Sequence, residues 1–368
     1  MRSTKTSGQE VVSKGLNGMR NRQNIFGPLL RTLCLLPVFI GFFMFSQGIR
    51  FAGSAEGKER IALLPFENFT EDPNALKFLM PKIRSRLEDK GFMVIDEATL
   101  DAFLLRERIR TTGCIGREAA GKMGRELDVR GIVLGSVNSF SNGEKPIVGL
   151  SARLVRTADC GILWADNAAF TGEDFTTVLG LGTIKEIGQL TDRVLDALFD
   201  SLAAYPLKKE SGKTYKIAVI PFKNDSRRDN AGMIATYLFL SALSKNKMFE
   251  AVEFGEVRRF MVENRIRGKG ELDYTNKDTL AEMTGVDGIL VGTVESYSEG
   301  KGNMPPEASI SARLIDARKN RILWCNRYEY RGDDDIVMLD WGRIRSAENV
   351  AYKILSKIVK DMETVTWQ

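Results

Sequence analysis

The stretch GREAAGK at residues 116–122 has the GxxxxGK spacing of a phosphate-binding loop, in which backbone N–H groups and a lysine hold phosphate oxygens. The next residue is Met123, so the hydroxyl group that would bind magnesium is missing. The stretch also precedes an expected strand, whereas a phosphate-binding loop follows one. We therefore interpret it as a solvent-facing helix and expect no cofactor there.

An acidic run, Asp333, Asp334 and Asp335, offers carboxylate oxygens, which are the ligands that a hard cation prefers. The spacing of the run matches no calcium-binding loop. The run lies ahead of an expected helix, where acidic side chains cap free N–H groups and favour the helix dipole. The sequence therefore predicts no metal site, and it makes these three acids candidates for a partner-binding surface.

The sequence of 368 residues contains no histidine, which excludes Ser-His-Asp catalysis, Cys-His catalysis and histidine metal sites. Three cysteines follow the N-terminal region, at Cys114, Cys160 and Cys325, with no CxxC spacing. An odd number of scattered cysteines gives no disulfide framework, although Cys114 and Cys160 could form one bridge. We predict a protein that is not an enzyme, with no catalytic, cofactor-binding or metal-binding residues.

Two arginines, Arg153 and Arg313, occupy the same position in two copies of the sequence SARL. Each lies in an expected strand with apolar neighbours. A guanidinium group at such a position could bind a partner protein or an anion. The alternative is a sheet-packed arginine whose aliphatic stem covers apolar surface. We favour the packed arrangement and keep both arginines as candidates for a partner surface.

The two SARL sequences belong to a longer internal repeat, and a recurrence of this kind indicates a repeated unit of fold. The second copy is longer at Glu299–Pro306, which is either a contact region or only a longer hairpin turn. The recurring stretches are RIALLPFENFT (60–70) with KIAVIPFKNDS (216–226), GIVLGSV (131–137) with GILVGTV (288–294), and SARLVRTADCGILW (151–164) with SARLIDARKNRILW (311–324).

Each copy has the same pattern of expected elements, β-α-β-α-α-β-β-β-α, which indicates an α/β fold with a mixed sheet covered by helices. Amphipathic helices are expected at 76–87 and 232–243, and closing helices at 184–202 and 344–362. We predict a first module at 56–204 and a second at 215–368. The polar residues 205–214 form the expected linker.

The N-terminal region has the order of a secretory signal: Arg20, Arg22 and Arg31 precede an apolar run at 33–45. This run is shorter than the roughly 20 residues that span a bilayer as a helix. We predict an N-terminal signal at 1–55, with cleavage after Ala55 and export to the periplasm. The alternatives are an inner-membrane anchor facing the periplasm and a cytosolic protein, and Met19 is a second candidate for the initiator.

The net charge of +5 comes from the front of the chain, since residues 1–55 hold seven of the 53 basic side chains and one of the 48 acidic ones. The rest of the chain is close to neutral. A nucleic-acid-binding domain normally carries a basic patch of its own, so we expect no nucleic-acid partner. We expect contact with a membrane only through the N-terminal segment or through a partner.

The repeated motifs also resemble a known module: a strand IA(V/L)(L/I)PF followed by N-x-(S/T), then G(I/V)L.G(S/T)V, then S.RL with a later ILW. This pattern looks like the α/β module of the TolB amino-terminal domain, the CsgG curli-export family and LpoB-type envelope lipoproteins. The resemblance implies an exported, non-enzymatic envelope protein that binds other envelope proteins and, as in several relatives, assembles into rings. The chain lacks a lipobox cysteine and a long alternating hairpin, which argues against a curli-type channel.

From the resemblance and the signal we predict a periplasmic scaffold or assembly factor that works through protein contacts, as a homo-oligomer and in the form of a ring. The expected partners are envelope proteins. The alternative is a regulator that binds and activates an envelope enzyme such as a peptidoglycan synthase.

Overall fold

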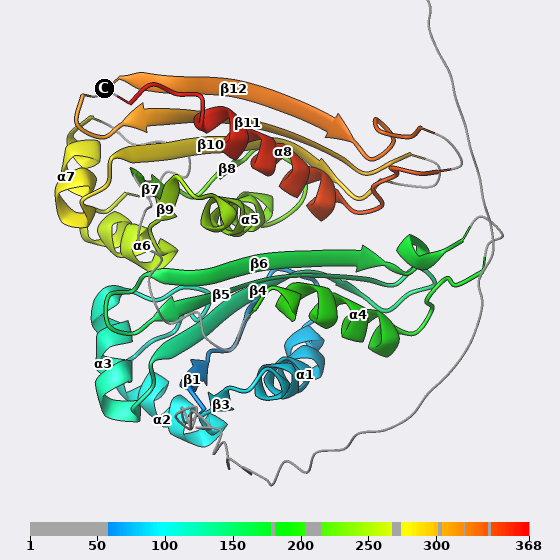
Figure 1. Cartoon of the computed structure of the whole chain (residues 1–368), viewed down its shortest axis with the longest axis horizontal. Coiled ribbons are helices and arrows are strands. Elements are labelled where there is room, and N and C mark those ends of the chain that lie inside the picture. The colour runs from blue at the N-terminus through cyan, green and yellow to red at the C-terminus, as the bar shows by residue number, and fades with distance from the viewer. Residues whose placement is uncertain are drawn as a thin grey trace, which may run out of the picture. The chain divides into compact units, whose positions relative to one another are not determined.

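The computed structural model describes residues 58–177, 181–202, 215–266, 274–300, 304–319, 321–337 and 340–367. The chain from Ser54 to Gln368 forms one compact unit. Its described residues form eight α-helices and two six-stranded mixed sheets, which confirms the predicted fold class (Figure 1). The expected signal at 1–55, with Ala55, and the linker at 205–214 lie outside the described residues.

The first module contains one sheet and four helices. Its elements are β1 (Arg60–Leu63), β2 (Glu67–Asn68), α1 (Ala75–Asp89), β3 (Met93–Val94), α2 (Glu97–Arg106), α3 (Arg117–Leu127), β4 (Gly131–Ser141), β5 (Ile147–Arg156), β6 (Ile162–Thr171), the 3-10 turn η1 (Gly172–Phe175) and α4 (Ile187–Asp200).

The second module repeats this order without the 3-10 turn. Its elements are β7 (Tyr215–Val219), β8 (Lys223–Asn224), α5 (Ala231–Lys245), β9 (Phe249–Ala251), α6 (Phe254–Glu263), α7 (Tyr274–Thr284), β10 (Gly288–Ser298), β11 (Glu307–Asp316), β12 (Ile322–Arg331) and α8 (Ala347–Met362).

The two sheets have the same strand order. The order is β3-β1-β4-β5-β6 in the first sheet and β9-β7-β10-β11-β12 in the second. In addition, β2 pairs with β4 and β8 pairs with β10. The short strands pair in parallel and the three long strands are antiparallel. A bulge interrupts β4 between Val137 and Ser139, and β10 has one between Val294 and Ser296. The sequence repeat therefore folds into two similar modules.

Close packing of a phenylalanine on a glycine explains two of the recurring motifs. Phe66 and Phe222, which end the PF motifs, are buried against Gly135 and Gly292. A Cβ atom at Gly135 would overlap the Phe66 ring and lie 2.5 Å from the Ser151 carbonyl oxygen. A Cβ atom at Gly292 would lie 2.5 Å from the Cδ1 atom of Phe222. The PF motifs and the GIVLGSV and GILVGTV stretches thus recur together, because the phenylalanine of one packs on a glycine of the other.

The Asn-x-(Ser/Thr) motifs form the same turn in both modules. The side-chain oxygen of Asn68 accepts hydrogen bonds from the Thr70 N–H at 3.0 Å and hydroxyl at 2.7 Å. Asn224 accepts the same pair of bonds from Ser226, at 3.1 and 2.6 Å. An Asx turn of this kind fixes the connection between the sheet and the first long helix.

The modules stack in layers, with helices between the two sheets (Figure 1). Helices α1 and α4 pack together, and α4 covers β5 and β6. Helix α5 packs on β9 and β10 of its own sheet and also on β5 and β6 of the first sheet. The sequence predicts an amphipathic helix at 232–243, but every residue from Ala231 to Leu243 except Met233 is buried, because a second sheet covers the outer face. None of the helices in the described part of the chain is long and apolar enough to cross a membrane.

We predict that Gly135→Ala lowers the free energy of unfolding by about 1–3 kcal/mol, because the added methyl group overpacks a site that holds the Phe66 ring. Gly188→Ala in α4 is the matched control, since nothing lies within 4 Å of its Cβ position. Alanine there changes the stability by about 1 kcal/mol or less, in the stabilising direction. Urea unfolding of the three proteins measures both effects, and equal stabilities would refute the packing explanation.

Candidate functional site at the junction of the two modules

The junction is built around Tyr237, a residue of α5. Its ring centroid lies 5.8 Å from that of Phe69 in the first module and 5.9 Å from that of Phe254 in the second. Phe69 and Cys114 belong to the same hydrophobic cluster as the core of the second module. The two modules therefore share one core at this point, and the apolar residues of α5 need the first sheet to cover them.

An ion pair between the modules is fully buried in this core. Arg153 of β5 and Glu253, the residue before α6, have no exposed side-chain surface. The Nε and Nη2 atoms of Arg153 donate to the Glu253 carboxylate at 3.0 and 3.1 Å, and Nη2 also donates to the Gly113 carbonyl at 2.7 Å. The guanidinium carbon lies 4.5 Å from the Tyr237 ring centroid. A charge buried in this way is stable only beside its partner, so the pair fixes how the modules dock.

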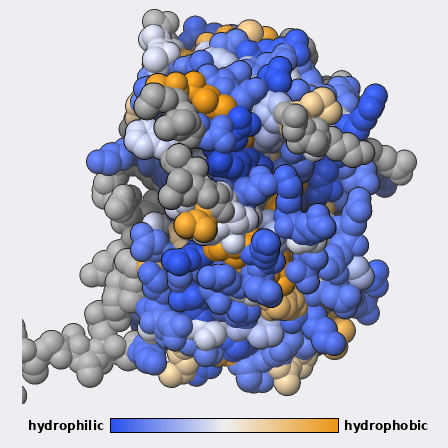
Figure 2. All heavy atoms as spheres, turned by 90° about the vertical axis from the view of Figure 1, so that its right-hand side faces the viewer, coloured by the Kyte–Doolittle hydropathy of each residue, from blue (hydrophilic) through white to orange (hydrophobic). Residues whose placement is uncertain are grey.

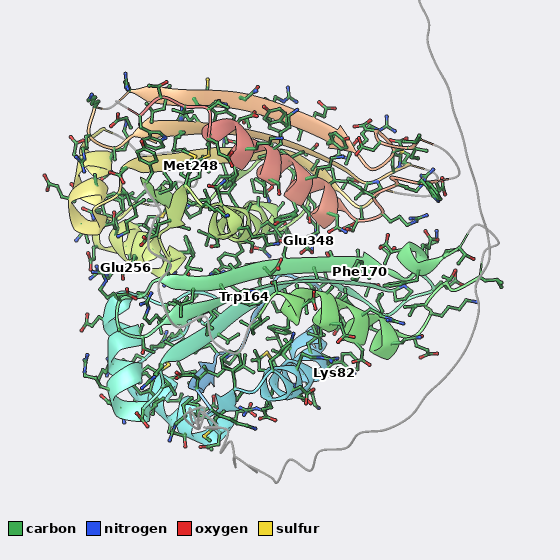
Figure 3. All side chains as sticks on the ribbon, viewed as in Figure 1. Lys82, Trp164, Phe170, Met248, Glu256 and Glu348 are labelled. Atoms are coloured by element: carbon green, nitrogen blue, oxygen red, sulfur yellow. The ribbon has the colours of Figure 1, made fainter. Side chains whose placement is uncertain are left out.

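A second buried acid, Glu348 in the first turn of α8, also lies between the modules (Figure 3). Asn138 of β4 donates a hydrogen bond to one of its oxygens at 2.8 Å, and the other oxygen has no partner. The carboxyl group packs on Gly149, where a Cβ atom would lie 2.9 Å from its carbon. Burial raises the pKa of Glu348 to about 8, and the nearby Glu299 carboxyl acts in the same direction. Glu348 is therefore largely protonated at neutral pH.

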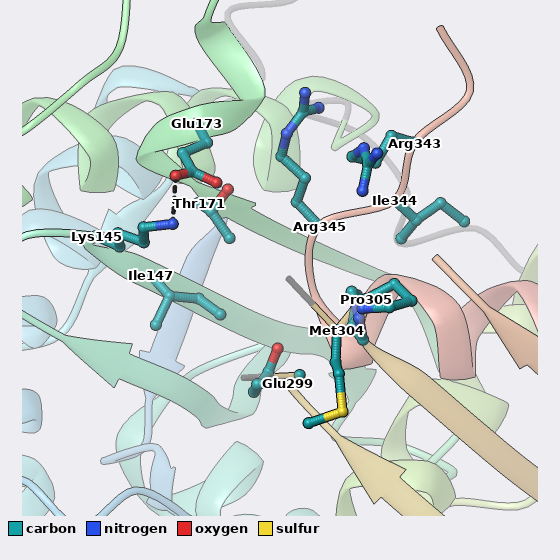
Figure 4. Close-up of a pocket in the computed structure, with 12 residues that line it drawn as sticks. Lys145, Ile147, Thr171, Glu173, Glu299, Met304, Pro305, Arg343, Ile344 and Arg345 are labelled. Carbon is teal, nitrogen blue, oxygen red and sulfur yellow. Dashed lines mark ion pairs between the residues drawn. The ribbon is translucent and has the colours of Figure 1, made fainter. Parts of the chain in front are cut away.

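A cavity of about 450 Å³ opens between the modules, at the end where the hairpin loops gather (Figure 4). Figure 2 views this side and shows a mainly hydrophilic surface with hydrophobic residues near its middle. Residues of both modules line the cavity, including described residues of the longer segment Glu299–Pro306. The lining residues are Lys145, Ile147, Thr171, Glu173, Glu299, Gly300, Met304, Pro305, Pro306, Arg343, Ile344 and Arg345.

The lining of the cavity is mixed in character, and several of its charged side chains are paired. It combines basic side chains, acidic side chains and the exposed, adaptable side chain of Met304. The basic Lys145 is paired with Glu173 at 2.7 Å, and Arg345 lies 3.8 Å from Asp174.

The structure separates the residues that the sequence named for a partner surface. Arg153 is buried inside the junction, and its partner is the second module of the same chain. Arg313 is exposed on the outer face of the second sheet. The shared SARL motif therefore has two different environments, and the packed interpretation applies to Arg153.

The three acids stay together in the turn after β12. Asp334 accepts a hydrogen bond from the Arg331 N–H at 2.8 Å, as Asp174 does from the Thr171 N–H at 2.7 Å. Asp333 lies 3.5 Å from the Arg331 guanidinium, and Asp335 pairs with Lys353 of α8. The sequence prediction that these acids cap the next helix is wrong, because α8 begins at Ala347 and Ser346 caps it; the three acids instead hold the turn after β12. In the described part of the chain no group of three or more potential ligands is placed to hold a metal ion.

The three cysteines are free thiols, so the bridge between Cys114 and Cys160 that the sequence allowed does not form in this structure. Both of these thiols are buried, and Cys325 is exposed. Burial raises the pKa of Cys114 to about 12, which keeps this thiol protonated and unreactive at neutral pH.

No sequence pattern pointed to Glu253, Glu348 and Asn138, which hold the modules together. Each looks like an ordinary polar residue until its partner in the other module is known. One signal was present: positions 82 and 86 are lysine and arginine in the first copy, whereas the aligned positions of the second copy are Leu238 and Ala242. Apolar residues on both faces of a helix indicate burial on both sides.

No family model matches the chain, and no curated protein matches it significantly. Similar solved structures include the PelC dodecamer from Paraburkholderia phytofirmans (17% identity, 40% of this chain and 85% of that chain, TM-score 0.29). Others are the LpoB C-terminal domain from Escherichia coli (15% identity, 33% and 87%, TM-score 0.26) and TolB from Acinetobacter baumannii (14% identity, 41% and 29%, TM-score 0.25). At these scores the similarities assign neither a family nor a function to this chain.

We predict that Arg153→Met destabilises the protein by about 3–5 kcal/mol, because it leaves the Glu253 carboxylate buried without a partner. Arg313→Met is the matched control, because the same residue at the equivalent position is exposed; its effect is within about 0.5 kcal/mol. The double variant Arg153→Met/Glu253→Met recovers part of the loss. Chemical unfolding measures all three, and similar losses for the two single variants would contradict a role for the buried pair.

The raised pKa of Glu348 predicts a loss of stability as the pH rises. The unfolded chain releases this proton near pH 4.5 and the folded chain near pH 8. The contribution is complete below pH 4.5 and is lost as the pH rises to 8, with up to a tenfold change in the unfolding equilibrium per pH unit. Glu348→Gln makes the profile flatter and raises the stability at pH 8.

The exposed Glu263→Gln is the control for this experiment and leaves the profile unchanged. Unfolding by urea at pH 5 and pH 8.5 measures the effect. A Glu348→Gln profile as steep as that of the unmodified chain would show that another group is responsible.

Proposed function

We propose that this chain is an exported, non-enzymatic scaffold or assembly factor of the cell envelope, which holds two modules as one rigid unit and binds envelope proteins in the periplasm. The observation that carries the proposal is the cavity of about 450 Å³ between the modules, which both modules line. The buried ion pair and the shared core fix how the two modules that line the cavity dock on each other. A preorganised site of this kind loses less conformational entropy when a partner binds.

The order of basic, apolar and small residues in the first 55 positions supports export. The mixed charges and the methionine of the cavity support a protein segment as its ligand. Partner contacts of this kind need no catalytic group.

We propose further that the chain acts without forming a ring, which changes our expectation of a homo-oligomer. In a ring, neighbouring copies could associate through the same kind of interface that joins the two modules. In that arrangement, α1 of one copy would pack on the outer face of the second sheet of the neighbouring copy. On α1, Lys82 and Arg86 form ion pairs at 2.8 Å with α4, and on the outer sheet face Arg327 pairs with Glu295. The desolvation free energy of burying these charges would exceed the free energy that the new contacts supply. Charged end faces are typical of terminal repeats that stop a stack.

Light scattering across a concentration series tests this point on the compact unit from Ser54 to Gln368. We expect the mass of a single chain at every concentration. A discrete closed oligomer would overturn the proposed single-chain state and support a ring.

The scaffold function is tested by photo-crosslinking in the envelope, with a photoreactive phenylalanine in place of the exposed Met304 of the cavity. We expect an adduct with an exported protein, and we expect Arg345→Glu to abolish it. The exposed Ile322 in β12 is the control position, and it gives no such adduct. Protease added to spheroplasts reports location. Adducts that are equal at both positions, or a chain protected from the protease, would contradict the proposal.

A further inference from the structure

Each module continues from its last strand into a loop that leads to the closing helix. The loop at 172–186 follows β6, and the loop at 332–346 follows β12. Both loops contribute residues to the junction cavity, and Arg345 of the second loop lies 3.8 Å from Asp174 of the first. These two loops, which we call the first and second tip loops, therefore lie at one end of the molecule, which faces the viewer in Figure 2.

Backbone hydrogen bonds close the base of both tip loops in the same way. The N–H of Ile184 donates to the Gly172 carbonyl at 3.0 Å, and the N–H of Ile344 donates to the Gly332 carbonyl at 2.8 Å. The two ends of each loop are thus held together beside the sheet. Compact surface loops whose ends are close in this way often carry function.

A second backbone bond fixes the outer part of each tip loop. The Thr177 N–H donates to the Leu181 carbonyl at 2.7 Å, and the Val337 N–H donates to the Trp341 carbonyl at 3.1 Å. Leu181 and Trp341 occupy equivalent positions, and their exposed fractions are 67% and 70%. Val337 is 88% exposed. Each tip loop therefore presents large apolar side chains to the outside from a backbone that is already closed.

The sequences of the tips are apolar where a turn that faces water is usually polar. They read TTVLGLG at 176–182 and IVMLDWG at 336–342. Exposed turns normally consist of Gly, Asn, Asp, Ser and Pro. The two tips share hydrophobic character but not shape, since one has leucine where the other has tryptophan. A lipid phase accepts apolar side chains of any shape, whereas a protein interface is packed to fit particular ones.

The charges of the tip loops are largely neutralised by pairing. The acid within the second tip, Asp340, lies 3.0 Å from the Arg343 guanidinium. The two loops hold seven acidic and three basic residues, and three basic residues outside them pair with these acids, which leaves a net charge of −1. Charge at this end therefore attracts neither an anionic surface nor a strongly charged partner, and the contact is made by the apolar tips.

We propose that the two tip loops insert into the interfacial layer of a lipid bilayer, so that the folded unit binds a membrane surface with this end. Leu181, Val337 and Trp341 enter the boundary between headgroups and acyl chains, where tryptophan is enriched in membrane proteins. The paired charges at the base stay among the headgroups. The loops lie on the membrane and do not cross it.

Two tips on one rigid unit bind more strongly than either tip alone. Once one tip has inserted, the insertion of the other is intramolecular, because the shared core fixes both modules in one unit. This proposal changes our expectation that the chain contacts a membrane only through the N-terminal segment or a partner. It does not depend on the proposed function, because Leu181, Val337 and Trp341 do not line the junction cavity.

Flotation with phosphatidylcholine vesicles tests the proposal on the unit from Ser54 to Gln368, which lacks the apolar run at 33–45. We expect the unit to float with the vesicles. Leu181→Ser and Trp341→Ser each weaken the partitioning by about tenfold, the factor for one large apolar side chain, and the double variant stays at background. Ile322→Ser is the control, since Ile322 is 57% exposed but begins β12, at the end opposite the second tip loop, and it leaves partitioning unchanged.

The depth and charge dependence of insertion give a second measurement. Lipids brominated on the upper part of the acyl chain quench the fluorescence of Trp341, and Trp341→Phe keeps most of the binding but loses the quenching. The chain has three other tryptophans, which lie outside the tip loops, so they give no quenching. Adding phosphatidylglycerol to the vesicles changes the binding by no more than about twofold, because the end carries little net charge.

No flotation above the level of the double serine variant would overturn the proposal. An equal loss with Ile322→Ser, or quenching that persists in Trp341→Phe, would do so as well. If the unit does not float and a photoreactive phenylalanine at position 341 forms an adduct with an envelope protein, the tips bind protein and not lipid. The Met304 crosslink is a separate measurement, so the failure of either proposal leaves the other standing.

Discussion

Helix α5 is enclosed by two sheets, and much of the remaining structure follows from that constraint. A helix that is apolar on all sides cannot end a stack, because its outer face would be exposed to water. The first sheet covers it, and the polar groups that become buried in the process need partners. Arg153 forms an ion pair with Glu253 there, and Asn138 donates a hydrogen bond to Glu348. The two modules are consequently one folding unit with a shared core.

Two similar modules in one chain allow equivalent positions to be used differently. On the covered face of the first sheet, small or neutral residues such as Gly149 and Asn138 admit α8. On the equivalent open face of the second sheet, Glu295 and Arg327 pair in contact with solvent. The backbone topology of the two sheets is the same, so the faces differ only in their side chains, which contact either the other module or water. The two-module unit therefore has a buried interface at its centre and solvated outer faces.

The buried polar groups of the junction also make its stability depend on pH. A protonated Glu348 is compatible with burial, and an ionised one is not, because its second oxygen has no donor. The docking of the modules is therefore linked to pH, whereas the phenylalanine-on-glycine contacts inside each module are not. The junction cavity depends on this docking, because residues of both modules line it.

The sequence by itself determined the order of elements, the mixed sheet and the existence of two similar modules, because strand and helix periodicity and turn residues act locally. Only the tertiary structure decided which of two identical motifs is buried. Arg153 and Arg313 have the same local sequence, yet one is enclosed and the other is exposed, because the second module covers the face of the first sheet that carries Arg153, whereas Arg313 lies on the outer face of the second sheet. Burial and ion pairing between residues 100 positions apart depend on how the modules stack, and no local pattern records that.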